Sequence, residues 1–377
     1  MKKNETLLIY SDSERDANLL YATGVWIGDP FIFLQINNRP TLVLHDLEWD
    51  RVRVAAPHCA LLPLVEIQNK IRSRGKSHPK PSDIIAEVLR SKKIRRVTVP
   101  ETFPLSVARE LESAGFRLDV RAGQFFPARE IKSAGEVKKI TEALRMAEAG
   151  VAAGVQALKQ SKIGRNRQLI YRNAPLTSER LRAIIDTTIL EAGGHPAHSI
   201  VAGGLQACDP HECGHGPLRA HEPIILDIFP RSQKTGYFGD ITRTVVRGRA
   251  TEAARKLYAT VKRAQEIAFE NIRPGVETHA VHRAVATFFE QQGYKTGKVN
   301  GRMQGFFHGT GHGLGLDIHE PLRMGAMSTG TLKAGQVITN EPGLYYPGIG
   351  GVRLEDDAVV TKTGSRNFTK FEKVFEV

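Results

Sequence analysis

The chain has 377 residues, of which 41% are hydrophobic, so it can bury a sizeable core and global disorder is excluded. Lys and Arg outnumber Asp and Glu by 53 to 40, for a formal net charge of +13. These basic residues are spread along the chain without interleaved aromatic residues, so we expect solvated basic faces and no specific nucleic-acid partner.

Three cysteines in a chain of this length do not make a disulfide framework. Residues 1–16 contain no apolar run of the kind found in a signal peptide. No apolar stretch reaches the roughly 18 residues that a membrane-spanning helix needs. We therefore expect a cytoplasmic protein with no membrane partner.

Short β-type runs alternate with helical patterns in the first third of the chain. The expected strands are 6–11, 30–36, 41–46, 59–65 and 95–100, and the expected helices are 82–92 and 104–115. This alternation predicts an α/β domain. No phosphate-cradling glycine pattern follows any of these strands, so a nucleotide site is not indicated.

A long helical pattern from Ser133 to Gln160 marks the start of a second domain. After it we expect a helix at 176–194, strands within 197–204, 222–230 and 236–248, helices at 252–272 and 277–293, and strands and turns over 336–364. This order is typical of an α+β domain. The expected domains are therefore 1–130 and 131–377.

Four acidic residues lie in apolar, strand-like surroundings: Asp227 in "IILDIF", Asp240 in "GDITRTVV", Glu341 in "TNEPGLYY" and Glu355 in "GVRLEDD". If the strands before and after 230–236 pair in an antiparallel manner around a turn, the two aspartates meet. Burying a carboxylate is costly unless it is paired or bound to a cation. Each acid alone is more often part of a salt bridge, but the four together with the glycine-flanked His312 indicate a metal site.

These segments, with "HGTGHGLGLDIHE" at 308–320, resemble the pita-bread metallopeptidases, in particular the Xaa-Pro dipeptidases (prolidases) and Xaa-Pro aminopeptidases. Residues 21–53 resemble a creatinase-type N-terminal domain. The resemblance covers essentially the whole chain. It implies an α+β fold with a creatinase-like α/β N-terminal domain (1–130), a pita-bread catalytic domain (131–377), and a homodimer.

The resemblance also implies a centre of two divalent metal ions. Asp227 would bind the first ion, Asp240 and Glu355 would bridge both, and His312 and Glu341 would complete the second. Four carboxylates and one imidazole suit Mn²⁺ and Co²⁺ and are compatible with Zn²⁺. Two ions can hold a bridging hydroxide that attacks a peptide carbonyl, and Glu341 is the candidate proton shuttle.

Three further histidines match substrate-site positions of the family. The resemblance implies that His211 and His319 bind substrate and stabilise the oxyanion. For His308, substrate binding and a structural role stay equally open. Arg353 matches an arginine that positions substrate, with a salt bridge to Asp356 or Asp357 as the alternative.

Two features depart from the family pattern. Asp227 and Asp240 are 13 residues apart, two more than expected, and Phe229 and Pro230 stand where small residues usually follow. The longer hairpin tip is expected to reshape the mouth of the site. A cluster made by His211 and nearby residues suggests a separate soft-metal site, but its spacing fits no standard zinc pattern. That cluster consists of Cys208, His211, Cys213 and His215, and we expect His195 and His198 to be loop residues.

The leading hypothesis is a dimetal peptidase that acts on short peptides at Xaa-Pro bonds. All five ligand positions are occupied, which disfavours the metal-free creatinases and the scaffold members that have lost their metals. The large N-terminal domain disfavours a methionine aminopeptidase. The alternatives are a hydrolase or lyase of the same fold with a small non-peptide substrate, and a non-catalytic binding scaffold.

Overall fold

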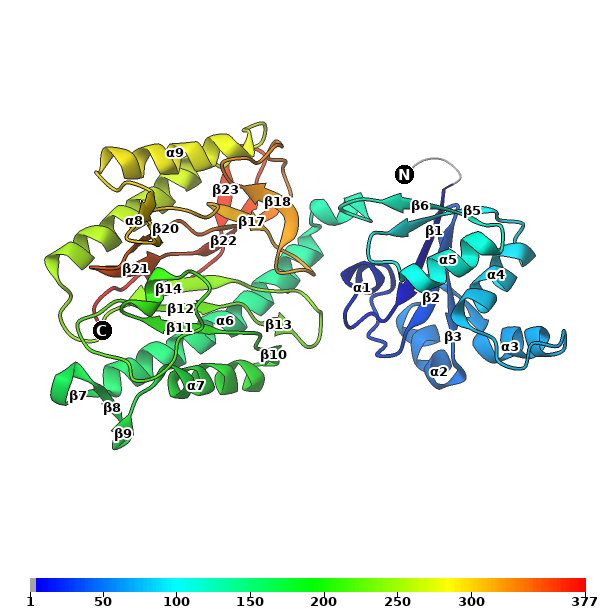
Figure 1. Ribbon diagram of the computed structural model, residues 1–377, viewed down its shortest axis with the longest axis horizontal. Coiled ribbons are helices and arrows are strands. Elements are labelled where there is room, and N and C mark those ends of the chain that lie inside the picture. Colours follow the sequence, from blue (N-terminus) through cyan, green and yellow to red (C-terminus); the bar gives the residue numbers. More distant parts are fainter. Residues whose placement is uncertain (1–4) are drawn as a thin grey trace. The chain divides into compact units, whose positions relative to one another are not determined.

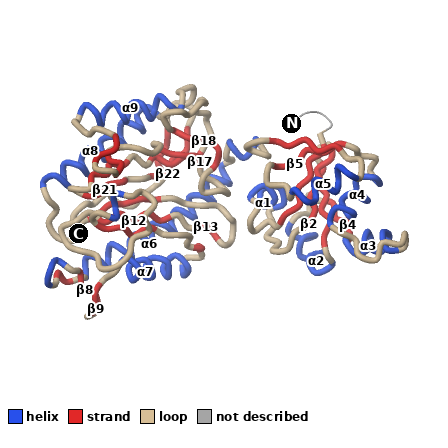
Figure 2. The backbone as a smooth tube through the Cα atoms, in the orientation of Figure 1, coloured by secondary structure: helices blue, strands red, loops and turns tan. Residues whose placement is uncertain are grey.

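The computed structural model describes residues 5–377, so the expectation about segment 1–16 falls partly outside the described residues. The chain divides into two compact units, the first ending at Arg129 and the second spanning Glu130–Val377. Figures 1 and 2 show the elements of each unit. None of the described helices combines the length and the apolar character needed to cross a bilayer.

The first unit is built on one mixed sheet of six strands in the order β4-β3-β2-β1-β5-β6. Its strands are β1 (Thr6–Ser11), β2 (Phe31–Ile36), β3 (Arg39–Leu44), β4 (Ala60–Pro63), β5 (Arg96–Pro100) and β6 (Arg117–Arg121). Its helices are α1 (Ala17–Thr23), α2 (Asp46–Ala55), α3 (Leu64–Arg72), α4 (Pro81–Ser91) and α5 (Leu105–Ser113), with the 3₁₀ turn η1 (Pro127–Glu130) at the unit boundary.

Successive residues of β1 point to opposite faces of this sheet, as strand geometry requires. Leu7 and Ile9 join one apolar cluster, whereas Leu8 joins another. The sheet is therefore buried on both faces, which confirms the α/β character expected from the sequence. The expected strand at 59–65 is too long, because helix α3 already begins at Leu64.

The second unit begins with the long helix α6 (Ala134–Gln160), and Ser133 caps its N-terminus by accepting from the Glu136 amide. Helix α7 (Ser178–Glu191) packs against α6 at two glycines. A Cβ added at Gly150 or Gly154 would lie 2.9 Å from Ile189 or Ile185, respectively. These glycines therefore set the close approach of the two helices. Helices α8 (Glu252–Asn271) and α9 (Thr278–Gln291) follow, and both were expected from the sequence.

The strands of the second unit form several small sheets (Figure 1). The three-stranded sheet β11-β12-β14 contains Ile200–Gly203, Ile224–Ile228 and Ile241–Val245. The five-stranded sheet β18-β17-β19-β22-β23 contains Glu320–Met324, Gly311–Gly313, Val337–Asn340, Asp356–Val360 and Ser365–Asn367. The hairpin β20-β21 is Gly343–Tyr346 and Gly350–Arg353. One apolar core joins α8 and α9 to β18–β22 residues such as Ile338 and Leu344.

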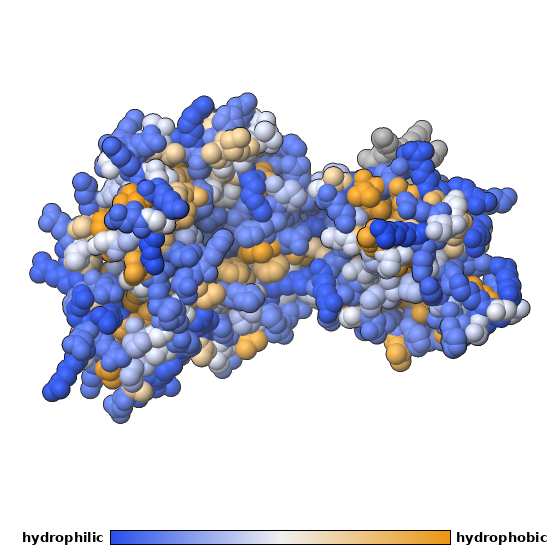
Figure 3. Space-filling view, in the orientation of Figure 1, coloured by the Kyte–Doolittle hydropathy of each residue, from blue (hydrophilic) through white to orange (hydrophobic). Residues whose placement is uncertain are grey.

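Short elements complete the second unit. They are β7 (Lys162–Ile163), η2 (Arg165–Arg167), β8 (Leu169–Tyr171), β9 (Ala174–Pro175), β10 (Gly194–His195), η3 (Gln206–Cys208), β13 (Arg231–Ser232), β15 (Gly297–Val299) and β16 (Arg302–Gln304). On the face of the molecule in Figure 3, hydrophilic side chains cover most of the surface of both units. Apolar side chains appear there in scattered groups, as is normal for a folded domain.

The tip of the β12–β14 hairpin differs from the simple turn expected at 230–236. Its residues Arg231 and Ser232 form β13, which pairs with β10 through His195 and Gly194. His195 is therefore a strand residue, and the expectation that it lies in a loop is wrong.

Candidate active site

One cavity of about 510 Å³ in the second unit brings together all nine residues singled out in the sequence. Its lining includes Asp227, Asp240, His312, Glu341, Glu355, His211, His308, His319 and Arg353. These residues come from segments up to 144 positions apart in the chain, from 211 to 355. The fold, and not local sequence, therefore assembles the site.

Most of the acidic residues of the site lie at the ends of strands. Asp227 lies within β12, opposite Thr242 of β14. Asp240 comes immediately before β14, Glu341 immediately after β19, and Glu355 in the two-residue break between β21 and β22. Three of the acids thus sit just outside the strands that were expected to contain them, where the backbone can turn their carboxylates into the cavity.

Three of the candidate ligands form a tight cluster. Asp240, His312 and Glu355 each offer a ligand atom within 4.8 Å of the other two. His312 Nε2 lies 3.8 Å from Asp240 Oδ2 and 3.5 Å from Glu341 Oε1. Thr242 Oγ1 donates to Glu355 Oε2 at 2.8 Å and so orients that carboxylate.

The protonation state of His312 favours a cation in this cluster. Burial lowers the pKa of His312 to about 3, so the ring is neutral. Its Nδ1 lies 3.1 Å from the Gly313 carbonyl oxygen, which fixes the proton on Nδ1. Nε2 therefore presents a lone pair toward two carboxyl groups, an arrangement that is favourable only with a proton or a metal cation between them.

The buried carboxylates of the cluster also favour a bound cation. Burial, reinforced by the charge of neighbouring acids, raises the pKa of Asp240 and Glu355 well above the ordinary values. Burial and the Asp227 charge raise the pKa of Glu341 to about 8, against the opposing effect of Arg353. Asp240 Oδ1 has no hydrogen-bond partner within residues 5–377. This donor set fits divalent cations, which would bind the unpartnered oxygen and offset the clustered negative charge.

Arg353 organises the opposite wall of the cavity. Its Nη2 donates to Asp227 Oδ2 at 2.6 Å and its Nη1 donates to the Tyr345 hydroxyl at 2.8 Å. The Tyr345 hydroxyl lies 2.8 Å from His308 Nε2. Burial lowers the pKa of His308 to about 3, and its Nδ1 lies 2.8 Å from the Gly309 carbonyl oxygen, so the proton of the neutral ring is on Nδ1 and Nε2 accepts from Tyr345.

The ion pair of Arg353 differs from the salt bridge to Asp356 or Asp357 that was the alternative from the sequence. Its partner is Asp227, whereas Asp356 pairs with Arg243 at 2.8 Å and with Lys373. Tyr345, which links Arg353 to His308, was missed in the sequence. Its position four residues after Glu341 in an apolar strand was the available signal, but a buried tyrosine is ordinarily read as core.

His319 and His211 face the open part of the cavity. The His319 ring stands edge-on to His312 with 4.5 Å between centroids, and desolvation lowers the pKa of His319. His211 is exposed and follows Pro210, whose carbonyl accepts from Arg353 Nη2 at 3.2 Å. Both imidazoles can therefore reach a bound molecule without displacing a core contact.

Apolar side chains line much of the rest of the cavity, namely Ile200, Phe229, Phe307 and Ile318, and the charged residues Asp209 and Arg323 also line it. Phe229 belongs to the β12–β14 hairpin, whose tip is fixed by several backbone hydrogen bonds. The Phe238 amide donates to Gly315 at 2.9 Å, and the Gly239 amide donates to Pro230 at 3.2 Å. The tip therefore holds Phe229 against the site.

The cysteine and histidine residues near His211 are engaged in other contacts. Cys208 is buried in an apolar cluster with Ile225 and Tyr345. The Cys213 carbonyl accepts from the Val201 amide, and His215 lies 3.5 Å from Glu212. The ligand cluster described above does not include any of them.

Comparison with known proteins places this cavity in a family. The family model described as metallopeptidase family M24 matches residues 138–362, which include every residue of the site. A Xaa-Pro dipeptidase of Pyrococcus horikoshii is 31% identical over 249 residues, covering 65% of this chain and 64% of that protein. The match therefore spans less than two thirds of that relative's own length.

Solved structures show the same fold along nearly the whole chain. A dipeptidase of Pyrococcus horikoshii superimposes with a TM-score of 0.78 at 28% identity, covering 99% of this chain and 96% of that one. An X-Pro aminopeptidase of Thermotoga maritima gives a TM-score of 0.81 at 22% identity, covering 99% and 98%. The expected architecture, an N-terminal domain followed by a pita-bread catalytic domain, is confirmed. Since the family model matches more than half of the residues and contains the whole acid–histidine centre, this chain belongs to metallopeptidase family M24.

Proposed function

We propose that this protein is a dimetal-dependent peptidase that hydrolyses short peptides at Xaa-Pro bonds. The observation that carries the proposal is the group of four carboxylates and one neutral imidazole that face one another in a single cavity. Asp227 would hold the first ion, Asp240 and Glu355 both ions, and His312 and Glu341 the second. The mostly hard ligand set favours Mn²⁺ or Co²⁺ and also accepts Zn²⁺.

When bound, two such ions lower the pKa of a water molecule and polarise a peptide carbonyl. Glu341 would accept the proton of the attacking water and pass it to the leaving amine. Neutral His319 can donate an N–H to the carbonyl oxygen as negative charge develops there. His211, on the open rim, would bind the substrate beside it.

Arg353 and His308 would position the substrate. Arg353 holds Asp227 directly, and through Tyr345 it also orders His308. The substrate-facing wall is therefore fixed before a peptide arrives, which reduces the cost of ordering it on binding.

The apolar wall supports a proline-containing substrate. Phe229, Phe307 and Ile318 offer surface for a ring that has no amide N–H to satisfy, beside a strongly polar centre. The names of the relatives, a Xaa-Pro dipeptidase and an X-Pro aminopeptidase, support the same bond specificity.

We extend the proposal to the whole protein. Residues 1–130 would be a creatinase-like domain and residues 131–377 the catalytic domain, in a cytoplasmic homodimer without a specific nucleic-acid or membrane partner. The division of the chain after Arg129 supports the boundary.

A substrate panel tests the proposed function. Purified protein loaded with Mn²⁺ should hydrolyse Ala-Pro and Leu-Pro, and should act much more slowly on Ala-Ala and Leu-Ala, with products quantified by chromatography. Equal rates on proline and alanine peptides would contradict the proline specificity. Failure to cleave any dipeptide or longer peptide with Mn²⁺, Co²⁺ or Zn²⁺ would favour a small non-peptide substrate or a binding scaffold.

A further inference from the structure

We propose that a buried ion pair between Lys132 and Glu320 positions His319 in the candidate active site. Among the described residues, the lining of the catalytic cavity includes His319 but neither member of the pair. Lys132 and Glu320 are therefore positioning residues, which act through the segment between β17 and β18. This inference rests on the proposed peptidase function and names two further residues on which the catalytic step depends.

His319 is the last residue of the segment 314–319, which connects β17 to β18. This segment runs through a series of bends and forms no regular ladder of its own. Its first two residues are held by backbone hydrogen bonds. The Leu314 amide donates to the Val337 carbonyl at 3.0 Å, and the Gly315 carbonyl accepts from the tip of the β12–β14 hairpin at 2.9 Å. These contacts lie several residues before His319, so the end of the segment that carries the imidazole depends on a different anchor.

The Glu320 side chain supplies that anchor. Its Oε1 accepts from the Leu316 amide at 3.2 Å, so the carboxylate reaches back across the segment that contains His319. A Cβ added at Gly315 would collide with the same oxygen, which shows how closely the backbone passes the carboxylate. Because His319 directly precedes Glu320 in the chain, the place of this carboxylate sets the path of the backbone at His319.

Lys132 holds the carboxylate from the start of helix α6. Its Nζ donates to Glu320 Oε2 at 2.7 Å, and the two side chains are only 3% and 4% exposed. The Lys132 amide donates to the Gly335 carbonyl at 2.8 Å, and the next residue, Ser133, caps α6. The lysine is therefore fixed by its own backbone, and the ion pair transmits that fixed position to the segment that carries His319.

The chemistry of the pair favours a role in geometry over a role in stability. Two apolar side chains of similar volume often stabilise a fold as well as a buried ion pair does. The ion pair instead supplies direction, because the carboxylate of Glu320 accepts from a fixed ammonium and from a fixed amide at once. The His319 ring stands edge-on to His312, with 4.5 Å between centroids. A displacement of such a donor by about 1 Å can cost on the order of 10²-fold in rate.

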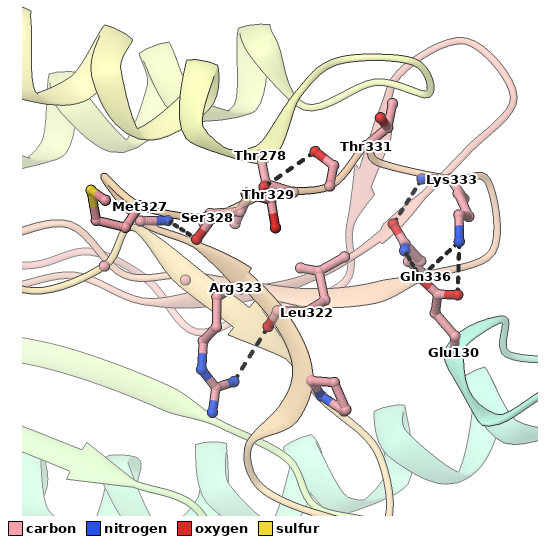
Figure 4. Close-up of a pocket in the computed structure, with 16 residues that line it drawn as sticks. Glu130, Thr278, Leu322, Arg323, Met327, Ser328, Thr329, Thr331, Lys333 and Gln336 are labelled. Atoms are coloured by element: carbon pink, nitrogen blue, oxygen red, sulfur yellow. Dashed lines mark hydrogen bonds and ion pairs between the residues drawn. The ribbon is translucent and has the colours of Figure 1, made fainter. Parts of the chain in front are cut away.

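The first test removes the ammonium group. In Mn²⁺-loaded protein, Lys132→Met should lower kcat for Ala-Pro about 10- to 100-fold, while KM and the metal content by elemental analysis stay near their wild-type values. Lys333→Met is the matched control, because it removes a lysine from another ion pair of the same unit, formed with Glu130 at 2.9 Å (Figure 4). The control should keep the wild-type kcat. An unchanged kcat in Lys132→Met, a loss that follows the metal content, or an equal loss in Lys333→Met would overturn the inference.

A double variant separates positioning from stability. Lys132→Met combined with Glu320→Met replaces the buried ion pair by two apolar side chains, so it should recover the thermal stability that Lys132→Met loses. It should not recover kcat, because no carboxylate is left to accept from the Leu316 amide. Recovery of kcat together with Tm would mean that the pair serves stability alone.

A double-mutant cycle identifies His319 as the residue through which the pair acts. When His319→Ala is already present, Lys132→Met should lower kcat by no more than about twofold, because the side chain that the pair positions is gone. Effects that multiply in the combined variant would show that the pair acts independently of His319, which contradicts the inference. An unmodified protein that cleaves no peptide would contradict the proposed function itself. That result differs from an active protein in which Lys132→Met keeps its rate, where the inference alone fails.

Discussion

Arg353 and Asp227 form a buried ion pair, with 2.6 Å between Nη2 and Oδ2, on the wall of a cavity that is otherwise crowded with carboxylates. The arginine lowers the pKa of Glu341 against the effect of burial, as Arg323 on the same cavity also does. Asp227 is therefore oriented by an arginine in the same cavity as the candidate metal ligands Asp240, His312 and Glu355. An outer partner of this kind sets the geometry and the basicity of a candidate metal ligand.

The first prediction concerns this pair. Arg353→Lys should lower kcat/KM about 10- to 100-fold, the usual range for loss of a partner of a metal ligand. The reason is that an ammonium group cannot contact Asp227, Tyr345 and the Pro210 carbonyl together, as the planar guanidinium does. Arg366→Lys, on the exposed strand β23, is the matched control and should have no effect. Equal activity in both variants would show that the ion pair does not support the site.

The second prediction separates His319 from Glu341. His319→Ala should keep both metal ions but lower kcat about 10²- to 10³-fold, as expected for loss of one oxyanion donor. Glu341→Gln should lose a metal ligand and the proton shuttle together, so both metal content and kcat should fall. Metal content by elemental analysis, with kcat on the same samples, checks both variants. Metal loss in His319→Ala with two ions and normal rates in Glu341→Gln would show that the roles are wrongly assigned.

The third prediction concerns the stability of the metal-free protein. The pKa of Glu341 is raised from 4.5 to about 8 in the folded chain. Stability linked to such a group is full below pH 4.5 and is lost as the pH rises through 8. Neutral His308 and His312 act in the opposite direction, but only below their ordinary value of 6.5.

Above pH 7 the two histidines should therefore no longer contribute, and the raised pKa of Glu341, together with the raised pKa values of Asp240 and Glu355, should set the slope. The Tm of chelated protein should fall between about pH 7 and pH 9, and Glu341→Gln or added Mn²⁺ should reduce that fall. Thermal unfolding followed by circular dichroism gives the comparison. A Tm that rises over this interval, or a slope that neither change affects, would contradict the raised pKa.

The fourth prediction concerns Phe229 in the β12–β14 hairpin. Phe229→Ala should remove part of the apolar wall offered to the proline ring and reduce the preference for Ala-Pro over Ala-Ala about tenfold, measured as a ratio of kcat/KM values. Because the hairpin tip is held by backbone hydrogen bonds, the substitution should leave metal binding unchanged. The same ratio in wild type and variant would mean that Phe229 does not contact the substrate.

Much of the fold was predictable because strong periodic patterns coincide with real elements. Helices α6, α8 and α9 lie where apolar residues recur at helical spacing, and β1, β2 and β12 lie where short apolar runs occur. The short elements were not predictable from such patterns. Strand β13, for example, exists because Arg231 pairs with His195, a contact between distant segments.

Part of the candidate site was likewise predictable from the sequence, and part was not. The identities of the acids and His312 could be read from the sequence because a carboxylate in an apolar strand is a local anomaly. The ion-pair partner of Arg353 could not be read from the sequence. Asp227 is 126 residues from Arg353 along the chain, whereas Asp356 is only three residues from it. Local spacing favoured the near acid, whereas the fold turns Asp356 toward Arg243 instead.

Metal dependence is tested most directly by titrating chelated protein with Mn²⁺ while Ala-Pro hydrolysis is recorded, alongside Asp240→Asn. We predict no activity without metal, activity that reaches its plateau at two ions per chain, and no recovery in Asp240→Asn, which loses a bridging anion. Full hydrolysis by protein shown by elemental analysis to contain no metal, or a plateau reached equally by Asp240→Asn, would contradict the dimetal mechanism.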